Sequence, residues 1–133
     1  MKDNISDMLT RIRNGQKARL LGVVLFWPTP NFCIKVLDLL KKEGFIRGYK
    51  KIITKTKKES VCVLLKYTHL NEPIIKKIER VSTPGKRIYV KSKSFWKLNT
   101  GRGVYIVTTS KGLFTDTENR FLNQGGEVLF YIE

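Results

Sequence analysis

A short stretch near the carboxy-terminal end carries the groups best suited to chemistry: three consecutive hydroxyls, a lysine and a glycine. These residues are Thr108, Thr109, Ser110, Lys111 and Gly112. Neighbours on a strand point to opposite faces, so an activated nucleophile made from Ser110 and Lys111 would need an unusual turn. Hydroxyls, an ammonium group and backbone amides can instead reach ribose hydroxyls, phosphates and base edges of an irregular RNA helix. The alternative is an ordinary hydroxyl-rich turn, since serine and threonine favour turns for local reasons.

No other residues are spaced for catalysis or for holding a metal ion. The acids are scattered, and the single histidine, His69, lies in a polar segment. Cys33 and Cys62 stand in apolar stretches without metal-ligand spacing, so we interpret them as small core residues in a reducing compartment. The glycines at 101–103 and 125–126 do not form a phosphate loop. We therefore expect no enzyme activity, cofactor, metal site or small-molecule substrate.

The charge of the chain indicates a polyanionic partner. Lys and Arg number 26 against 11 Asp and Glu, a formal net charge of +15, and they extend from Lys2 to Arg120. So large an excess repels itself, and binding to nucleic acid would relieve it through counterion release. A basic face kept for solubility is the weaker alternative, and no long amphipathic basic helix favours a membrane surface. The charge thus favours the RNA interpretation of residues Thr108–Gly112, which we call the hydroxyl loop.

A basic hairpin offers a second set of RNA contacts. It begins with Lys86, after which Arg87, Tyr89 and Lys91 alternate with the apolar residues Ile88 and Val90. Period-two alternation places Arg87, Tyr89 and Lys91 on one face of a strand. A tyrosine between two cations can stack on a base or a sugar, or it can be a core-edge residue with a solvated hydroxyl.

An acid stands close to this proposed RNA face. Glu127 follows the glycine pair Gly125 and Gly126. A carboxylate would repel phosphate unless it accepts hydrogen bonds. We expect Glu127 to brace the hydroxyl loop by accepting from backbone amides or from Ser110, with a solvent-facing residue as the alternative.

The amino-terminal half predicts two helices and a short sheet. Asn4 can cap a helix with apolar residues at Ile5, Met8, Leu9 and Ile12, and Gly15 can end it. Thr10, Arg11 and Asn14 then face solvent, available to phosphate or simply solvated. The remaining predicted elements are a strand over 20–26, a helix over 31–42 and a hairpin over 45–54 and 61–67. Trp27, Phe95 and Trp96 are interpreted as packing residues.

The carboxy-terminal half predicts mostly strands with one short helix. Strands are expected over 74–81, 87–90, 104–107 and 127–132, with a type II turn at Pro84–Gly85. Thr115 and Glu118 are spaced as a capping box for a helix through Leu122, ended by the glycine pair. The polar segment 68–73 is the best boundary. We predict an α+β fold of two small lobes: 1–70, with two helices packed on a short sheet, and 71–133, mostly β with a short helix, binding RNA.

Several segments together resemble one known family, the eighth small-subunit ribosomal protein of bacterial type. They occur in the family's order over nearly the whole chain: Asp7–Asn14, Lys42–Ile46, Arg80–Val90, Thr108–Gly112, Thr115–Asp116 and Gly125–Leu129. The resemblance implies a two-lobe fold that binds the central domain of small-subunit ribosomal RNA during assembly, with neighbouring ribosomal proteins as further partners. It also assigns RNA contacts to Thr109–Gly112, with Tyr89 and the turn 125–127 alongside. A free-standing RNA-binding regulator or assembly factor is the alternative.

Three departures from the family pattern are visible. Thr108 stands where the family usually has serine, segment 20–32 is unusually apolar, and segment 91–100 contains Phe95 and Trp96. The Lys-, Ile- and Phe-rich composition is compatible with an AT-rich organelle genome, and no import signal is visible. The first expectation is therefore a ribosome in the mitochondrial matrix, with the plastid stroma and the bacterial cytoplasm as alternatives.

Overall fold

The computed structural model describes residues 3–94 and 102–133, which divide into two compact units. The division falls between Ile75 and Lys76, a little beyond the polar segment 68–73. Residues 74 and 75 belong with the amino-terminal unit because the Ile75 amide donates to the Gln16 side chain at 3.2 Å, and the Ile74 amide to the Lys66 carbonyl at 3.2 Å. The predicted α+β class is confirmed.

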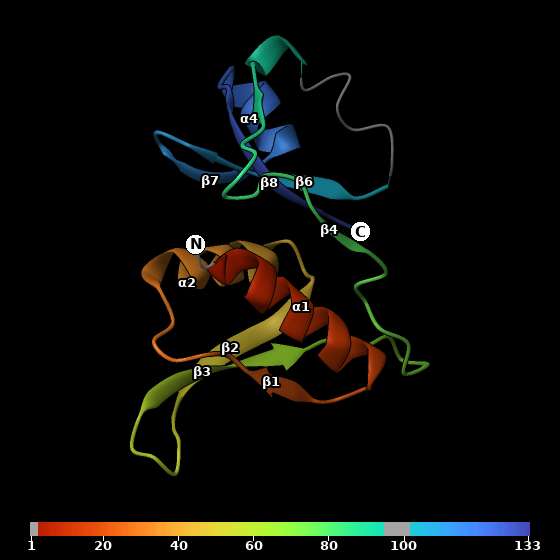
Figure 1. Ribbon diagram of the computed structural model, residues 1–133. Helices are drawn as coiled ribbons and strands as arrows, with labels where there is room; N and C mark the ends of the chain where they lie inside the picture. The colour runs from red at the N-terminus through yellow and green to blue at the C-terminus, as the bar shows by residue number, and fades with distance from the viewer. Residues whose placement is uncertain (1–2, 95–101) are drawn as a thin grey trace. The chain divides into compact units, whose positions relative to one another are not determined.

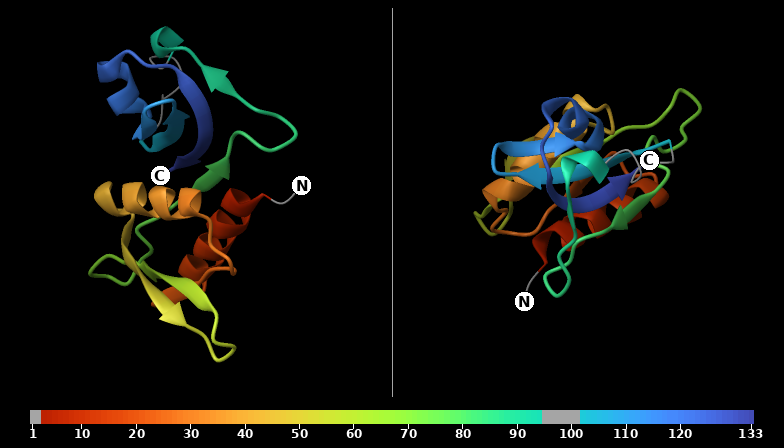
Figure 2. Two further views of the ribbon diagram at one scale, coloured as in Figure 1. Left: turned by 90° about the vertical axis from the view of Figure 1, so that its left-hand side faces the viewer. Right: turned by 90° about the horizontal axis from the view of Figure 1, so that it is seen from above.

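The amino-terminal unit is a three-stranded antiparallel sheet with two helices on one of its faces (Figures 1 and 2). Its elements are α1 (Asn4–Lys17), β1 (Gly22–Val24), α2 (Asn31–Lys42), β2 (Ile46–Ile53) and β3 (Glu59–Leu65). The strand order is β1-β3-β2. The predicted hairpin and second helix are confirmed, whereas the strand expected over 20–26 is limited to the three residues that pair with β3.

Helix α1 differs from its prediction at both ends. Asp3, and not Asn4, is the N-cap, and its carboxylate accepts from the Ser6 amide at 3.1 Å. Gly15 does not end the helix, which continues to Lys17. A Cβ on Gly15 would stand 2.3 Å from Val23 Cγ1. Glycine is therefore needed there because the helix lies directly on the sheet.

The core of this unit follows the predicted apolar spacing. The residues predicted on the inner faces of the two helices are all buried, and alternate residues of β3 meet them. They are Ile5, Met8, Leu9, Ile12, Cys33, Val36, Leu37, Leu40, Val61, Val63 and Leu65. No helix in residues 3–94 and 102–133 is long and apolar enough to span a membrane.

In its described residues, the carboxy-terminal unit is a five-stranded antiparallel sheet with one short α-helix. Its elements are β4 (Ile78–Arg80), β5 (Tyr89–Val90), the 3-10 turn η1 (Ser92–Ser94), β6 (Val104–Thr109), β7 (Gly112–Thr115), α4 (Asp116–Leu122) and β8 (Gly126–Ile132). The order is β4-β8-β6-β7, and β5 also pairs with β8. Strand β8 is buried along Val128–Ile132 and forms the centre of the unit.

The start of α4 agrees with the prediction, whereas the residue that ends α4 and the type of turn at Pro84–Gly85 differ from it. The capping box of Thr115 and Glu118 is present at the start of α4. The predicted last residue of the helix, Leu122, is confirmed, but the C-cap is Asn123 in the left-handed conformation and not the glycine pair. Backbone hydrogen bonds join Thr83 and Lys86 in both directions, yet Gly85 does not have the positive φ that a type II turn requires.

Candidate nucleic-acid interface

The sheet brings three distant parts of the chain into one row. Glu127 on β8 pairs with Tyr89 on β5 and with Thr108 on β6. Residues directly opposite in an antiparallel pair project their side chains to the same face. Tyr89, Glu127 and Thr108 therefore share one face at the end of the sheet where the β6–β7 hairpin turns.

The hydroxyl loop is that hairpin turn. Thr108 and Thr109 end β6, Gly112 begins β7, and Ser110 and Lys111 are the two turn residues. Thr109 Oγ1 donates to the Gly112 carbonyl and accepts from the Lys111 amide, each at 3.1 Å. The Thr109 hydroxyl thus holds the turn together, while the exposed side chains of Ser110 and Lys111 can meet a ligand.

Gly112 has a backbone requirement that the turn explains. Its φ is +132°, a conformation that side-chain-bearing residues rarely adopt, and it is exposed. Ser110 and Lys111 both have negative φ, so the turn lacks the positive-φ pair of the usual two-residue hairpin. Glycine at position 112 accommodates the change in chain direction. Ser110 and Lys111 are therefore turn residues, and not the neighbours on a strand that the sequence predicts.

Glu127 pairs with Arg87, so the expected brace to the hydroxyl loop is wrong. Arg87 Nη1 lies 3.0 Å from Glu127 Oε2, and the glutamate side chain is only 13% exposed. Within the described part of the chain, no hydrogen bond joins the Glu127 carboxylate to Ser110. The guanidinium compensates a carboxylate that would otherwise repel phosphate at this face.

Gly126 is a packing position. A Cβ there would stand 2.5 Å from the Thr108 carbonyl oxygen and 2.8 Å from Val107 Cγ1. Gly126 therefore allows β8 to approach β6 closely, directly beneath the row of Tyr89, Glu127 and Thr108. Gly125, which precedes it, is exposed.

Tyr89 presents its ring to solvent. The residue is 71% exposed, which excludes the core-edge alternative. The adjacent Val90 turns the other way and packs against the buried pair Val107 and Val128. Lys86, in the turn before β5, is also exposed. The predicted directions of Tyr89 and Val90 are confirmed, but within the described residues β4 and β5 both pair with β8 and form no hairpin with each other.

The candidates on α1 belong to the other compact unit. Thr10, Arg11 and Asn14 are exposed, as expected. Arg11 is already engaged: its Nε lies 2.9 Å from Asp7 Oδ1, and its Nη1 donates to the Val24 carbonyl at 3.0 Å. These three residues are therefore described as part of the amino-terminal unit, apart from the carboxy-terminal set.

Trp27 is a potential binding residue that the sequence interpretation missed. It is 50% exposed and so is not the packing residue expected. Lys58 Nζ lies 4.8 Å from the centroid of its ring. Local sequence carries no signal of this pair, because the two residues meet only through the fold. Phe95 and Trp96 lie outside the described residues.

Both cysteines are free thiols, as expected. Cys33 is buried and Cys62 partly so. Burial, and to a smaller extent the charges of Asp3 and Asp7, raise the pKa of the Cys33 thiol from 9.0 to about 11. Among residues 3–94 and 102–133, no group of three or more His, Cys, Asp or Glu side chains could hold a metal ion.

Comparisons with known proteins agree on one family. The family model described as Ribosomal protein S8 matches residues 3–132. The small ribosomal subunit protein uS8 of Acidiphilium cryptum is 46% identical over 129 residues, 97% of each chain. That of Wigglesworthia glossinidia brevipalpis is 45% identical over 133 residues, 100% of this chain and 98% of the relative. The chain therefore belongs to the ribosomal protein S8 family.

Proposed function

We propose that this protein is a structural constituent of the small ribosomal subunit that binds the central domain of small-subunit ribosomal RNA and supports its assembly. Membership of the ribosomal protein S8 family supports the ribosomal role. The formal charge of +15 suits a protein that neutralises phosphates over much of its surface. The proposal includes neighbouring small-subunit proteins as partners and no catalytic activity.

One observation carries the choice of RNA-binding surface. The row of Tyr89, Glu127 and Thr108 lies beside an exposed turn that offers the Ser110 hydroxyl and the Lys111 ammonium group. A hydroxyl can hydrogen-bond to ribose, an ammonium group binds phosphate, and an exposed tyrosine ring can stack on an unpaired base. An irregular RNA helix presents all three of these groups within a short distance.

The remaining candidates are assigned supporting parts. Lys86 and the pair Arg87 and Glu127 would contact the backbone of the same RNA, and Gly125 and Gly126 would let it approach the sheet. We propose that Thr10, Arg11 and Asn14 contact RNA from the amino-terminal lobe, residues 1–70, and that 71–133 act as the principal RNA-binding lobe. For location, the relatives named above are bacterial and favour a bacterial cytoplasm. The mitochondrial matrix gains no support from them.

The test removes the two exposed groups of the loop one at a time. We expect Lys111→Ala to weaken binding to a central-domain RNA fragment and to lower the salt slope of log K by about one. Ser110→Ala should weaken binding by several-fold, as expected for the loss of one polar contact worth about 1 kcal/mol. Binding is measured by filter retention at several salt concentrations. Lys35→Ala, an exposed lysine on α2, is the matched control for loss of one charge.

Two results would contradict the proposal. Equal affinities of Ser110→Ala, Lys111→Ala and the unaltered protein at every salt concentration would remove the hydroxyl loop from the interface. Failure of the protein to co-sediment with small subunits after a moderate-salt wash would favour the free-standing regulator or assembly factor.

A further inference from the structure

The amino-terminal sheet has a second face that its helices do not cover. Gly15 of α1 packs on Val23 and Leu65, so these side chains point toward the helices. Their neighbours along the strands must point the other way. The register places Val24, Cys62 and Lys50 in one row on this second face, and Ile52 and Ser60 in the next row, where Ser60 is buried and Lys50 is exposed.

The hairpin that forms this face is densely basic. Six cations and no acid occur from Arg47 to Lys58, and all six side chains are exposed. They are Arg47, Lys50, Lys51, Lys55, Lys57 and Lys58. Within the described part of the chain, their only ion pair joins Lys51 Nζ to Glu59 Oε1 at 3.8 Å. Both partners of that pair are mostly exposed, so it contributes little and leaves the positive potential of the hairpin intact.

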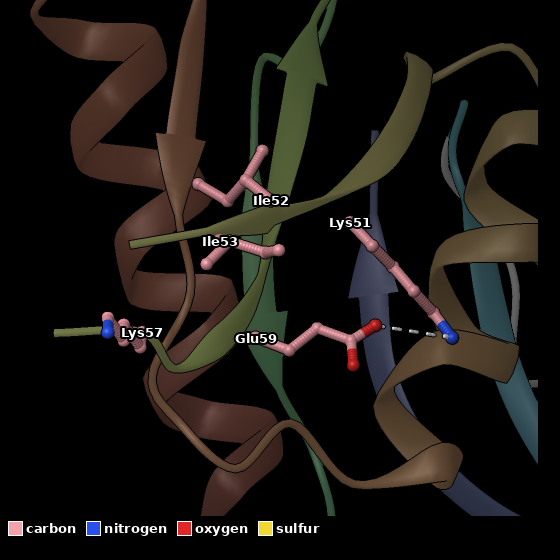
Figure 3. A pocket seen from close by; sticks show the side chains of 5 residues that line it. All are labelled: Lys51, Ile52, Ile53, Lys57 and Glu59. Atoms are coloured by element: carbon pink, nitrogen blue, oxygen red, sulfur yellow. Dashed lines mark ion pairs between the residues drawn. The ribbon is translucent and has the colours of Figure 1, made fainter. Parts of the chain in front are cut away.

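An open pocket of about 480 Å³ lies at this hairpin (Figure 3). It is lined by Lys51, Ile52, Ile53, Lys57 and Glu59, and Ile53 is 78% exposed. Figure 3 shows Lys51 and Glu59 extending toward each other while Lys57 stands apart from that pair. By the strand alternation, the lining side chains of Lys51, Ile53 and Glu59 point to the face opposite to Lys50 and Ile52, so the pocket lies at the edge of the hairpin and not on the second face itself. Glu59 already compensates Lys51, whereas Lys57 makes no ion pair within the described residues and can meet a phosphate.

Trp27 supplies an aromatic ring at the same end of the sheet. The Leu25 amide donates to the Val61 carbonyl at 2.8 Å, which holds the chain before Trp27 against β3. Lys58 Nζ lies 4.8 Å from the centroid of the indole ring, and half of the Trp27 surface remains exposed. A half-exposed indole among lysines can stack on a nucleobase while the cations contact the adjoining phosphates.

We propose that Trp27 and the β2–β3 hairpin form a second RNA-binding surface, which takes unpaired nucleotides by stacking a base on Trp27 and contacting phosphates through Lys57 and Lys58. The inference deepens the proposed ribosomal function and rests on it, but it uses a different compact unit and a different RNA conformation. A single strand is the ligand that fits, because bases inside a duplex do not expose their faces for stacking. A protein partner fits less well, because it would need acidic side chains to compensate six cations and also a group that packs on the Trp27 indole.

The test uses the fluorescence of Trp27 in the full chain. The chain has two tryptophans, so Trp96→Phe leaves Trp27 as the only reporter, and Trp27→Phe is the matched counterpart that retains Trp96. The probes are a short mixed-sequence single-stranded RNA and the same sequence annealed to its complement. We expect the single strand to quench the Trp27 emission and the duplex to quench it far less.

Binding of the labelled single strand is measured in parallel by anisotropy at constant salt. Trp27→Ala should weaken it by about tenfold or more, as expected for the loss of one base–aromatic stack, whereas Trp27→Phe should retain most of the affinity. Lys57→Ala combined with Lys58→Ala should weaken binding and flatten its salt dependence. Circular dichroism of each variant checks that the fold is intact.

The outcomes separate this inference from the proposed function. Substitution of Ser110 and Lys111 by alanine should impair binding of the central-domain fragment and leave the quenching of Trp27 unchanged. Absence of quenching by the single strand, or equal quenching by the duplex, would overturn the inference whatever the hydroxyl loop does. A photo-crosslink from position 27 to a ribosomal protein in assembled small subunits would overturn it in favour of a protein partner.

Discussion

Replacement of Gly126 by alanine tests the packing that positions the interface. The new Cβ would lie 2.5 Å from the Thr108 carbonyl oxygen, 2.8 Å from Val107 Cγ1 and 2.9 Å from Thr109 Cγ2. The nearest of these atoms belongs to the backbone of β6, so no side-chain rotation relieves the contact. Strand β8 must move away from β6 at the point where Glu127 pairs with Thr108.

The expected cost is about 3 kcal/mol in the free energy of unfolding. Overpacking of a well-packed interior costs about 1–3 kcal/mol, and each ladder hydrogen bond lost adds roughly 1 kcal/mol. Alanine also has less conformational entropy than glycine in the unfolded chain, which offsets about 0.4–1 kcal/mol of this destabilisation. With a urea dependence of about 1–3 kcal/mol per molar, the unfolding midpoint should fall by roughly 1–3 M.

The measurement is urea unfolding followed by circular dichroism, with Gly85→Ala as the control. A Cβ on Gly85 has no heavy atom within 4 Å, and Gly85 does not have a positive φ. Gly85→Ala should therefore leave the midpoint nearly unchanged or raise it slightly. If Gly126→Ala were as stable as Gly85→Ala, the close approach of β8 and β6 would not be the reason for glycine at position 126.

Four further predictions concern a helix cap, the Cys33 thiol and the exposed Tyr89 ring. Thr115→Ala removes the capping box of α4 and should cost about 1 kcal/mol in urea unfolding, and Thr115→Ser should restore most of the loss. Cys33, with its pKa raised to about 11, should resist alkylation at pH 8 in the native protein, whereas the less buried Cys62 reacts; equal rates would contradict its burial. Because the folded state holds the Cys33 proton more tightly than an unfolded thiol of pKa 9.0, its contribution to stability is complete below about pH 9 and is lost toward pH 11, as thermal unfolding across that range can show. Tyr89→Ala should weaken binding of the central-domain RNA fragment by about 1–3 kcal/mol without changing the fold, and unchanged affinity would exclude stacking on this ring.

Element type followed from local periodicity more reliably than element ends. The apolar spacing in α1 and α2 predicted the buried faces correctly, because a 3.6-residue period allows only one face to meet the core. The ends depended on other contacts: Asp3 caps α1 in place of Asn4, and Gly15 lies within the helix because Val23 leaves no room for a side chain. For α4 the predicted last residue, Leu122, is correct, but Asn123 and not the glycine pair is its C-cap.

The sequence by itself determined the chemistry of this protein: a large positive charge, a hydroxyl loop, a capping box and the segments that carry the family resemblance. These properties are local or additive, so they do not depend on which residues meet across the fold. Only the tertiary structure decided the pairings, because strand register brings together residues far apart in the chain. Strand register places Tyr89, Glu127 and Thr108 in one row. The fold also pairs Glu127 with Arg87 and places Lys58 over the half-exposed Trp27 ring.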